Sequence, residues 1–216
     1  MENNKTYFKV SGFLSKGIFC LAILFSTSGC QKKFDSEKEL WSYVKDVENG
    51  YSHEKKIGNL KYTLTYRPTD VLVKQTLTNN YDKNTIDSLR KKYGEYLYFN
   101  LSMSANNQEL LNSKAGNKNN FGAMVNQLAF EMHNKIYLVS KSRDTVPLAD
   151  YIYPRMYGMS NNTNILLVYP KDRALFENEF FHFTVQDLGF FTGEVGFKVP
   201  TKPILEEPRL TFDQTL

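Results

Sequence analysis

The side chains that could act as metal ligands are scattered along this chain. Its three histidines, His53, His133 and His182, have no second histidine or cysteine at the spacing of a zinc site. His182 lies in the alternating stretch 181–185, where it faces solvent if the apolar residues face inward. The histidine pattern therefore predicts no metal site.

The glycines and serines do not match the motifs of nucleotide-binding or hydrolytic enzymes. Gly189, Gly193 and Gly196 are spaced wrongly for a dinucleotide-binding loop, and no glycine-rich run ends in Lys-Ser or Lys-Thr. No Gly-x-Ser-x-Gly motif occurs, and Ser102 and Ser104 have no neighbouring histidine. The sequence therefore predicts no catalytic residue, no enzymatic activity and no cofactor.

Acidic residues near predicted strand ends are the remaining candidates for hydrolysis, since glycoside cleavage needs two carboxyl groups about 5–9 Å apart across a cleft. The candidates are Glu131, Asp150, Asp187 and Glu194. Turns and helix surfaces are the commoner positions for such residues, so we expect structural roles for them.

One long connection combines aromatic and polar side chains. Asparagine runs usually occupy turns, because Asn tolerates a left-handed backbone. Asparagines beside tyrosines can also form an adaptable polar binding surface. If the chain has a binding face, the sequence favours a surface formed by Tyr151, Tyr153, Arg155, Tyr157, Asn161, Asn162 and Asn164.

Two triplets, Asp87-Ser88-Leu89 and Asp144-Thr145-Val146, resemble the Asp-Ser/Thr-aliphatic acceptor motif of some bacterial O-glycosylation systems. Ser88 falls in a predicted helix, whereas Thr145 falls in a predicted turn. The resemblance therefore points to Thr145 as the candidate acceptor.

The amino-terminal stretch has the pattern of a secretory signal. Lys5, Lys9 and Lys16 precede the apolar run 17–25, and small residues follow it. A membrane-spanning helix needs about 20 apolar residues, so this run is too short to be one. The pattern predicts export of the chain.

The end of this signal, Ser28-Gly29-Cys30, resembles the lipobox of bacterial lipoproteins. In that family a peptidase cleaves before the cysteine, and acyl chains are attached to it. Thr27 departs from the aliphatic residue usual at its position. An aspartate after the cysteine tends to retain such proteins at the inner membrane, so Gln31 implies the outer membrane, with the side of that membrane left open. The alternative is an ordinary cleaved signal that leaves Cys30 as a free thiol.

Lipidation would give the chain three parts: a signal peptide at 1–29, a short tether at 30–35 and a single globular domain at 36–216. One acyl chain binds a membrane only marginally, at about 0.8 kcal/mol for each buried CH₂, whereas two or three chains bind durably. The resemblance thus implies the membrane as a partner through acyl chains on Cys30.

Net charge and cysteine content narrow the possible partners and the possible chemistry of the mature domain. The formal net charge is +4, of which the first 29 residues, with three lysines and one glutamate, contribute +2. The nearly balanced remainder gives no argument for a nucleic-acid partner. The cysteines are Cys20, which leaves with the signal, and Cys30. No disulfide or cysteine nucleophile is then expected in the mature domain.

Alternating apolar and polar residues predict strands with one buried face at 60–67 and 96–105. The apolar run 165–169 predicts a strand covered on both faces. Further strands are predicted at 51–57, 136–141, 146–153, 180–186, 194–199 and 209–213.

Helices are predicted at 37–48, 82–93 and 119–133, whereas 71–77 fits a strand or a helix. The first begins with the capping pattern Ser36-Glu37-Lys38-Glu39. Many short strands without a βαβ repeat predict an α+β fold, mainly antiparallel β. We expect a two-layer sandwich with two or three inserted or flanking helices.

These patterns favour a membrane-anchored envelope lipoprotein that acts as a non-enzymatic interaction or structural subunit of an envelope assembly, with another envelope protein as its partner. The alternatives are a β-sandwich that binds a glycan or a peptide and an envelope hydrolase.

Overall fold

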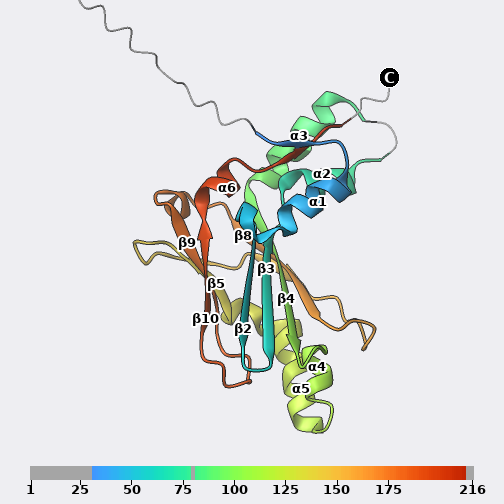
Figure 1. Ribbon diagram of the computed structural model, residues 1–216, viewed down its shortest axis with the longest axis vertical. Coiled ribbons are helices and arrows are strands. Elements are labelled where there is room, and N and C mark those ends of the chain that lie inside the picture. The colour runs from blue at the N-terminus through green and yellow to red at the C-terminus, as the bar shows by residue number, and fades with distance from the viewer. Residues whose placement is uncertain (1–30, 79–80, 213–216) are drawn as a thin grey trace, which may run out of the picture.

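The computed structural model describes residues 31–78 and 81–212. Its two main β-sheets face each other, with helices at both ends (Figure 1), and β1 and β11 form a third sheet of two strands. The predicted signal peptide and Cys30 lie outside these residues. The larger sheet has the order β2-β3-β4-β8-β7, and the smaller has the order β10-β9-β5-β6. All pairs within both sheets are antiparallel. The predicted α+β sandwich is confirmed.

The bounds of the strands follow the predicted alternation closely. The larger sheet contains β2 (Ser52–Ile57), β3 (Leu60–Tyr66), β4 (Tyr96–Ala105), β8 (Thr163–Pro170) and β7 (Asp150–Ile152). The smaller sheet contains β10 (Val195–Pro200), β9 (Phe180–Val185), β5 (Ile136–Val139) and β6 (Thr145–Pro147).

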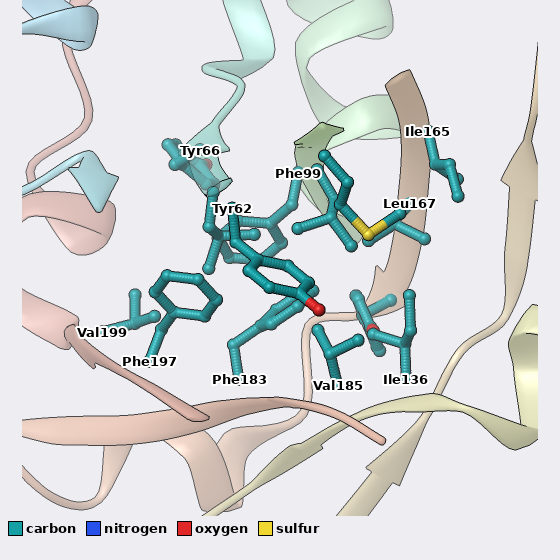
Figure 2. Packing of buried hydrophobic residues seen from close by; sticks show 14 of the residues in the cluster. Tyr62, Tyr66, Phe99, Ile136, Ile165, Leu167, Phe183, Val185, Phe197 and Val199 are labelled. Carbon is teal, nitrogen blue, oxygen red and sulfur yellow. The ribbon is translucent and has the colours of Figure 1, made fainter. Parts of the chain in front are cut away.

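The inner faces of the two sheets meet in an aromatic core. Phe99 of β4 lies 5.7 Å from Phe183 of β9, measured between ring centroids. Tyr169 of β8 and Phe197 of β10 lie 6.0 and 6.2 Å from the same Phe183 ring. Figure 2 shows Phe183 and Phe197 of the smaller sheet pointing towards Tyr62 and Phe99 of the larger. Tilted and edge-to-face contacts of this kind add to the stability that burial itself provides.

The predicted strand 146–153 is in fact two strands in different sheets. β6 belongs to the smaller sheet and β7 to the larger, and Leu148 lies buried between them. Pro147 has no backbone N–H with which to continue a ladder, which favours a change of sheet there. The Ala149 N–H then bonds to the Val168 carbonyl at 2.9 Å. The chain thus closes one side of the sandwich.

The strand β8 also differs from expectation. Ile165, Leu167 and Tyr169 are buried, but Leu166 and Val168 on its other face are only half-buried. The prediction that both faces are covered was therefore wrong, because no layer packs fully over the outward face of the larger sheet.

The predicted helices form, with changes at their ends. The bounds are α1 (Glu37–Lys45), α2 (Thr69–Thr76), α3 (Lys83–Gly94), α4 (Leu110–Ser113), α5 (Lys118–Asn126) and α6 (Thr201–Leu205). Ser36 caps α1, since its hydroxyl accepts from the Glu39 N–H at 3.2 Å. The predicted helix 37–48 stops early because Asp46 leaves the helical conformation, and a 3₁₀ turn, Val47–Asn49, follows.

Two other segments differ from what their sequence pattern predicts or leaves open. The ambiguous stretch 71–77 is mostly helical and belongs to α2. The predicted helix 119–133 becomes a π-helical turn over Gln127–Glu131 after α5. A 3₁₀ turn, Met132–Asn134, then leads into β5.

Candidate interaction site

The residues next to the predicted anchor are bound to the body. The side-chain amide of Gln31 donates to the Glu207 carbonyl at 3.0 Å. The short strand β1 (Lys33–Phe34) then pairs in parallel with β11 (Arg209–Leu210). Residues 31–34 of the expected tether are therefore part of the fold, and the body begins directly after Cys30.

A buried ion pair fixes β11 to the helices beneath it. The Asp70 carboxylate, on a side chain only 3% exposed, accepts two hydrogen bonds from the Arg90 guanidinium, both at 2.7 Å. The same carboxylate accepts from the Leu210 N–H at 2.8 Å. Hydrogen bonding to Asp70 raises the pKa of Arg90. This bidentate pair joins α2, α3 and β11.

Glu207 provides a second connection to the core. Its carboxylate accepts from the Tyr66 hydroxyl at 2.8 Å and from the Thr69 N–H at 2.9 Å. Burial, together with the charge of Glu207, raises the pKa of Tyr66, so the phenol stays neutral and remains a donor. The backbone and side chain of Glu207 thereby link Gln31 to the larger sheet.

The opposite end of the molecule carries the β9–β10 connection and α5 (Figure 1). Within this connection, the Asp187 carboxylate accepts backbone hydrogen bonds from Gly189, Phe190, Phe191 and Gly193, at 2.8, 2.8, 3.2 and 3.3 Å. Burial opposes ionisation of Asp187, but these N–H groups outweigh it and lower the pKa of the carboxyl. The Asp187 carboxylate therefore fixes the backbone of the loop from Gly189 to Gly193.

Further contacts fix this loop against α4 and α5. The Lys114 ammonium donates to the Gly189 carbonyl at 2.9 Å and lies 4.0 Å from the centroid of the Phe190 ring. The Gln127 amide donates to the Leu188 carbonyl at 3.3 Å. Phe190 is thus partly covered, whereas its neighbour Phe191 is not.

Phe191 projects from the loop with 97% of its surface exposed and a backbone φ of 58°. Non-glycine residues seldom adopt a positive φ, so the surrounding hydrogen bonds must hold this conformation. Beside the ring is a hollow of about 270 Å³, lined by Lys114, Asn120, Ala123, Met124, Gln127, Leu188, Gly189 and Phe191. We call Phe191 and this hollow the distal site.

Phe191 is not among the residues predicted from the sequence as a binding surface. A usable signal was present, because Phe190 and Phe191 stand together between Gly189 and Gly193. Neighbouring side chains in a short connection between two strands point in different directions, so one of these two aromatic rings is expected to face solvent.

The residues predicted as a binding surface do not lie in one place. Tyr151 and Tyr153 pack against the core, and both hydroxyl oxygens are buried. The Arg155 guanidinium lies 4.9 Å from the centroid of the Tyr157 ring, which is largely exposed. Asn161 is exposed as well.

The remaining two members of that set, Asn162 and Asn164, line a different feature. It is a groove of about 420 Å³ on the outward face of the larger sheet. We call it the sheet groove, and it is lined by Trp41, Lys45, Ser52, Glu54, Lys61, Thr63, Thr65, Asn100, Ser102, Asn162 and Asn164.

The predicted glycosylation acceptor, Thr145, is exposed at the first position of β6, next to Asp144. His182 is exposed, as the alternation of its strand predicts. Burial lowers the pKa of His53. Within residues 31–78 and 81–212, no three side chains of His, Cys, Asp or Glu are grouped so that they could hold a metal ion.

The four acidic candidates have separate partners. Asp187 caps its own loop, as described above, and Glu194 accepts from the Tyr137 hydroxyl at 2.9 Å. Asp150 accepts from the Tyr151 N–H, and Glu131 accepts from the Asn126 amide. Each therefore has the structural role expected from its position.

No family model matches the chain, and no curated protein matches it. A solved structure of a protein of unknown function from Burkholderia pseudomallei K96243 is similar over 75% of this chain and 84% of that one. Its identity is 11% and its TM-score 0.38. In the described part of the chain, no helix has the length and apolar character needed to cross a membrane.

Proposed function

We propose that this protein is a membrane-anchored envelope lipoprotein that serves as a non-enzymatic interaction or structural subunit of an assembly in the cell envelope. Acyl chains on Cys30 hold it at the outer membrane, and a second envelope protein binds the distal site. The observation that carries the proposal is the exposed Phe191 on a loop fixed by Asp187, at the end opposite to the one where the described chain begins.

The attachment supports this arrangement. Gln31 follows the predicted lipidated cysteine and is already bonded to the body. An anchor on Cys30 would therefore hold one defined end of the sandwich against the membrane, and the distal site would point away from it. The proposal applies to a body on either side of the outer membrane.

The energetics of the distal site suit a protein partner. Removing a phenylalanine side chain from water contributes about 1.5–3 kcal/mol. Aromatic residues with well-packed surroundings supply much of the binding energy at protein interfaces. The loop is already ordered by Asp187 and Lys114, so binding would cost little conformational entropy.

The experiment is an affinity purification of the full-length protein from envelope extracts, comparing Phe191→Glu with Phe130→Glu. Phe130 is a matched control, since it is 69% exposed but not part of the distal site. We expect a stoichiometric envelope protein with the native chain and with Phe130→Glu, and its loss with Phe191→Glu. Retention of the partner by Phe191→Glu would contradict the proposed site.

The anchor is tested separately by mass spectrometry of the mature protein. The expected result is an amino-terminal Cys30 that carries acyl chains. An unmodified thiol on Cys30, or a mature chain that begins elsewhere, would reject the lipoprotein proposal.

A ligand-binding role is the second candidate, and the sheet groove favours it. Its size falls within the range of small-molecule sites, and polar side chains from several strands converge in it. The proposal here is a lipoprotein that presents this groove to a glycan or a peptide.

A further inference from the structure

The floor of the sheet groove is built from short polar side chains in register on neighbouring strands. Thr65 of β3 lies opposite Asn100 of β4, and Thr63 lies opposite Ser102. Asn164 of β8 lies opposite Ser102 on its other side. Most of these outward positions hold Ser, Thr or Asn, with Glu54 opposite Thr63 and Leu166 opposite Asn100 as the exceptions. The short polar side chains leave a hollow in the sheet surface that offers both donors and acceptors.

Part of this floor is fixed in place. The hydroxyl oxygens of Ser52 and Thr65 lie 3.0 Å apart and share a hydrogen bond, and both residues are buried. Buried hydroxyls that are satisfied by each other keep their rotamers without a ligand. This part of the floor is therefore preorganised.

The helix α1 forms one wall. The indole N–H of Trp41 donates to the Glu37 carboxylate at 3.1 Å, which orients the ring. Trp41, Lys45 and Asn100 also line an adjoining hollow of about 410 Å³, together with Lys38 and Ser42. The two hollows share these residues, so they form one extended channel along the sheet and past α1.

Charge is uneven along this channel. At the hairpin end, Lys61 is paired with Glu54 at 2.9 Å. At the α1 end, neither Lys38 nor Lys45 has an ion-pair partner among the described residues. The Lys45 ammonium lies instead 5.8 Å from the centroid of the Trp41 ring. The end with the tryptophan therefore carries two lysines without an ion-pair partner, beside the Glu37 carboxylate that accepts from the indole.

We infer that the channel binds an acidic oligosaccharide, that is, a chain of sugars that includes a carboxylate-bearing unit. This inference rests on the ligand-binding function proposed above. Sugar hydroxyls would bond to Asn100, Ser102 and Asn164, an apolar sugar face would lie against Trp41, and the carboxylate would pair with Lys45.

The geometry favours a sugar over a peptide. Peptides that bind sheets usually add a strand along an edge, where the backbone N–H and C=O groups are unpaired. The channel lies on the face of the sheet, where the backbone is already paired between β3, β4 and β8 and only side chains are presented. Hydroxyl and amide side chains match the hydroxyl groups of a sugar directly.

The test uses the intrinsic fluorescence of Trp41, which is the single tryptophan of the chain and lies in the channel. Full-length protein in detergent is titrated with a hyaluronan hexasaccharide as the acidic probe. Cellohexaose serves as the neutral sugar, and a polyglutamate peptide as the acidic non-sugar. A saturable change in emission is expected with the hyaluronan hexasaccharide, and binding at least tenfold weaker with the other two probes.

Variants locate the binding. Asn100→Ala and Asn164→Ala are each expected to weaken binding of the hexasaccharide about tenfold, since one lost hydrogen bond in a binding site is worth about 1.4 kcal/mol. Lys45→Glu is expected to weaken binding of the hexasaccharide further. Because the Lys45 side chain is exposed, this substitution should not disturb the packing of the fold. Asn161→Ala is the control, since Asn161 is exposed beside the channel but does not line it.

Four results would overturn the inference, and the fourth would leave the ligand-binding function in place. The first is no response to the hyaluronan hexasaccharide. The second is equal binding of polyglutamate, which would mean charge attraction alone. The third is equal weakening by Asn161→Ala and Asn164→Ala. If cellohexaose or a peptide binds the channel more tightly, the ligand-binding function stands and the acidic-sugar inference fails. Purification with Phe191→Glu tests the partner proposal independently.

Discussion

Single residues fix both ends of this molecule through buried or multiply bonded carboxylates. Asp70 connects α2, α3 and β11, and Asp187 holds the loop that presents Phe191. Each is an acidic side chain whose partners are mostly remote from it in the sequence or are backbone groups. Their effects can be separated by measurements on single variants.

Replacing Arg90 by methionine should destabilise the fold by about 3 kcal/mol, because it leaves the buried Asp70 carboxylate without its cation. The control is Lys83→Met on the same helix, which breaks an exposed ion pair with Asp87 and should lower the free energy of unfolding far less. Urea unfolding monitored by Trp41 fluorescence measures both. Equal costs would mean that Asp70 and Arg90 do not act as a buried pair.

The loop at the distal site should loosen in acid. Its carboxyl, Asp187, has a folded pKa below the ordinary Asp value of about 3.9. The stabilisation from its ionised form is therefore complete above that ordinary value and is lost as the pH falls through the folded pKa. Amide resonances of Gly189 and Phe190 should titrate together with that pKa. In Asp187→Asn these shifts should be absent, and an unchanged titration in the variant would contradict the assignment.

At the scale of elements, the connection after α1 shows how a turn is tied to a distant helix. Gly50 ends the 3₁₀ turn with a φ of 76°, and an added Cβ would meet the side chain of Pro203 in α6 at 3.1 Å. Gly58, in the β2–β3 turn, also has a positive φ, but an added Cβ there would meet nothing within 4 Å. Substitution at Gly58 therefore tests backbone strain alone, whereas substitution at Gly50 tests strain together with packing.

Substituting alanine at these glycines should have unequal effects. Gly58→Ala should lower the free energy of unfolding by about 1 kcal/mol, because a residue with a Cβ is strained in a left-handed backbone conformation. Gly50→Ala should cost about 2–3 kcal/mol, because the same strain is joined by contact with Pro203. Midpoints of urea unfolding compare the two. If Gly50→Ala costs no more than Gly58→Ala, then α6 adapts to the added methyl group.

At the scale of the whole molecule, the start of the described chain and the distal site lie at opposite ends of a single sandwich. The described chain begins beside α3 and α6, and the β9–β10 connection lies at the other end (Figure 1). Because residues 31–34 are bonded to the body, a membrane anchor on Cys30 leaves little freedom for reorientation. The proposal therefore includes a fixed direction for the distal site.

This direction can be measured in vesicles. If Cys30 is acylated, a cysteine introduced at position 191 or 205 is the single reactive thiol of the mature chain. A fluorophore at Leu205, an exposed residue of α6, should transfer energy efficiently to a dye in the bilayer. A fluorophore at Phe191 should transfer much less. Equal transfer from both positions would reject the fixed orientation.

Local patterns determined most of the fold class. The strands β3 and β4 were predicted from strict alternation, since a side-chain period of two is a property of the strand itself. The cap of α1 at Ser36 is likewise a contact within one turn of helix. Such features depend on neighbours within a few residues, so they can be read before any tertiary contact is known.

Tertiary structure decided where the functional candidates lie. The predicted tyrosine-rich surface was divided, because packing of Tyr151 and Tyr153 depends on sheets formed by distant segments. The sheet groove combines α1 with β2, β3, β4 and β8, and no local pattern gives their register. Gln31 bonds to a residue 176 positions away. The sequence alone therefore determined the elements and the expected anchor. The contact between Gln31 and Glu207 was decided only by the tertiary structure, because it depends on the relative placement of every element between them.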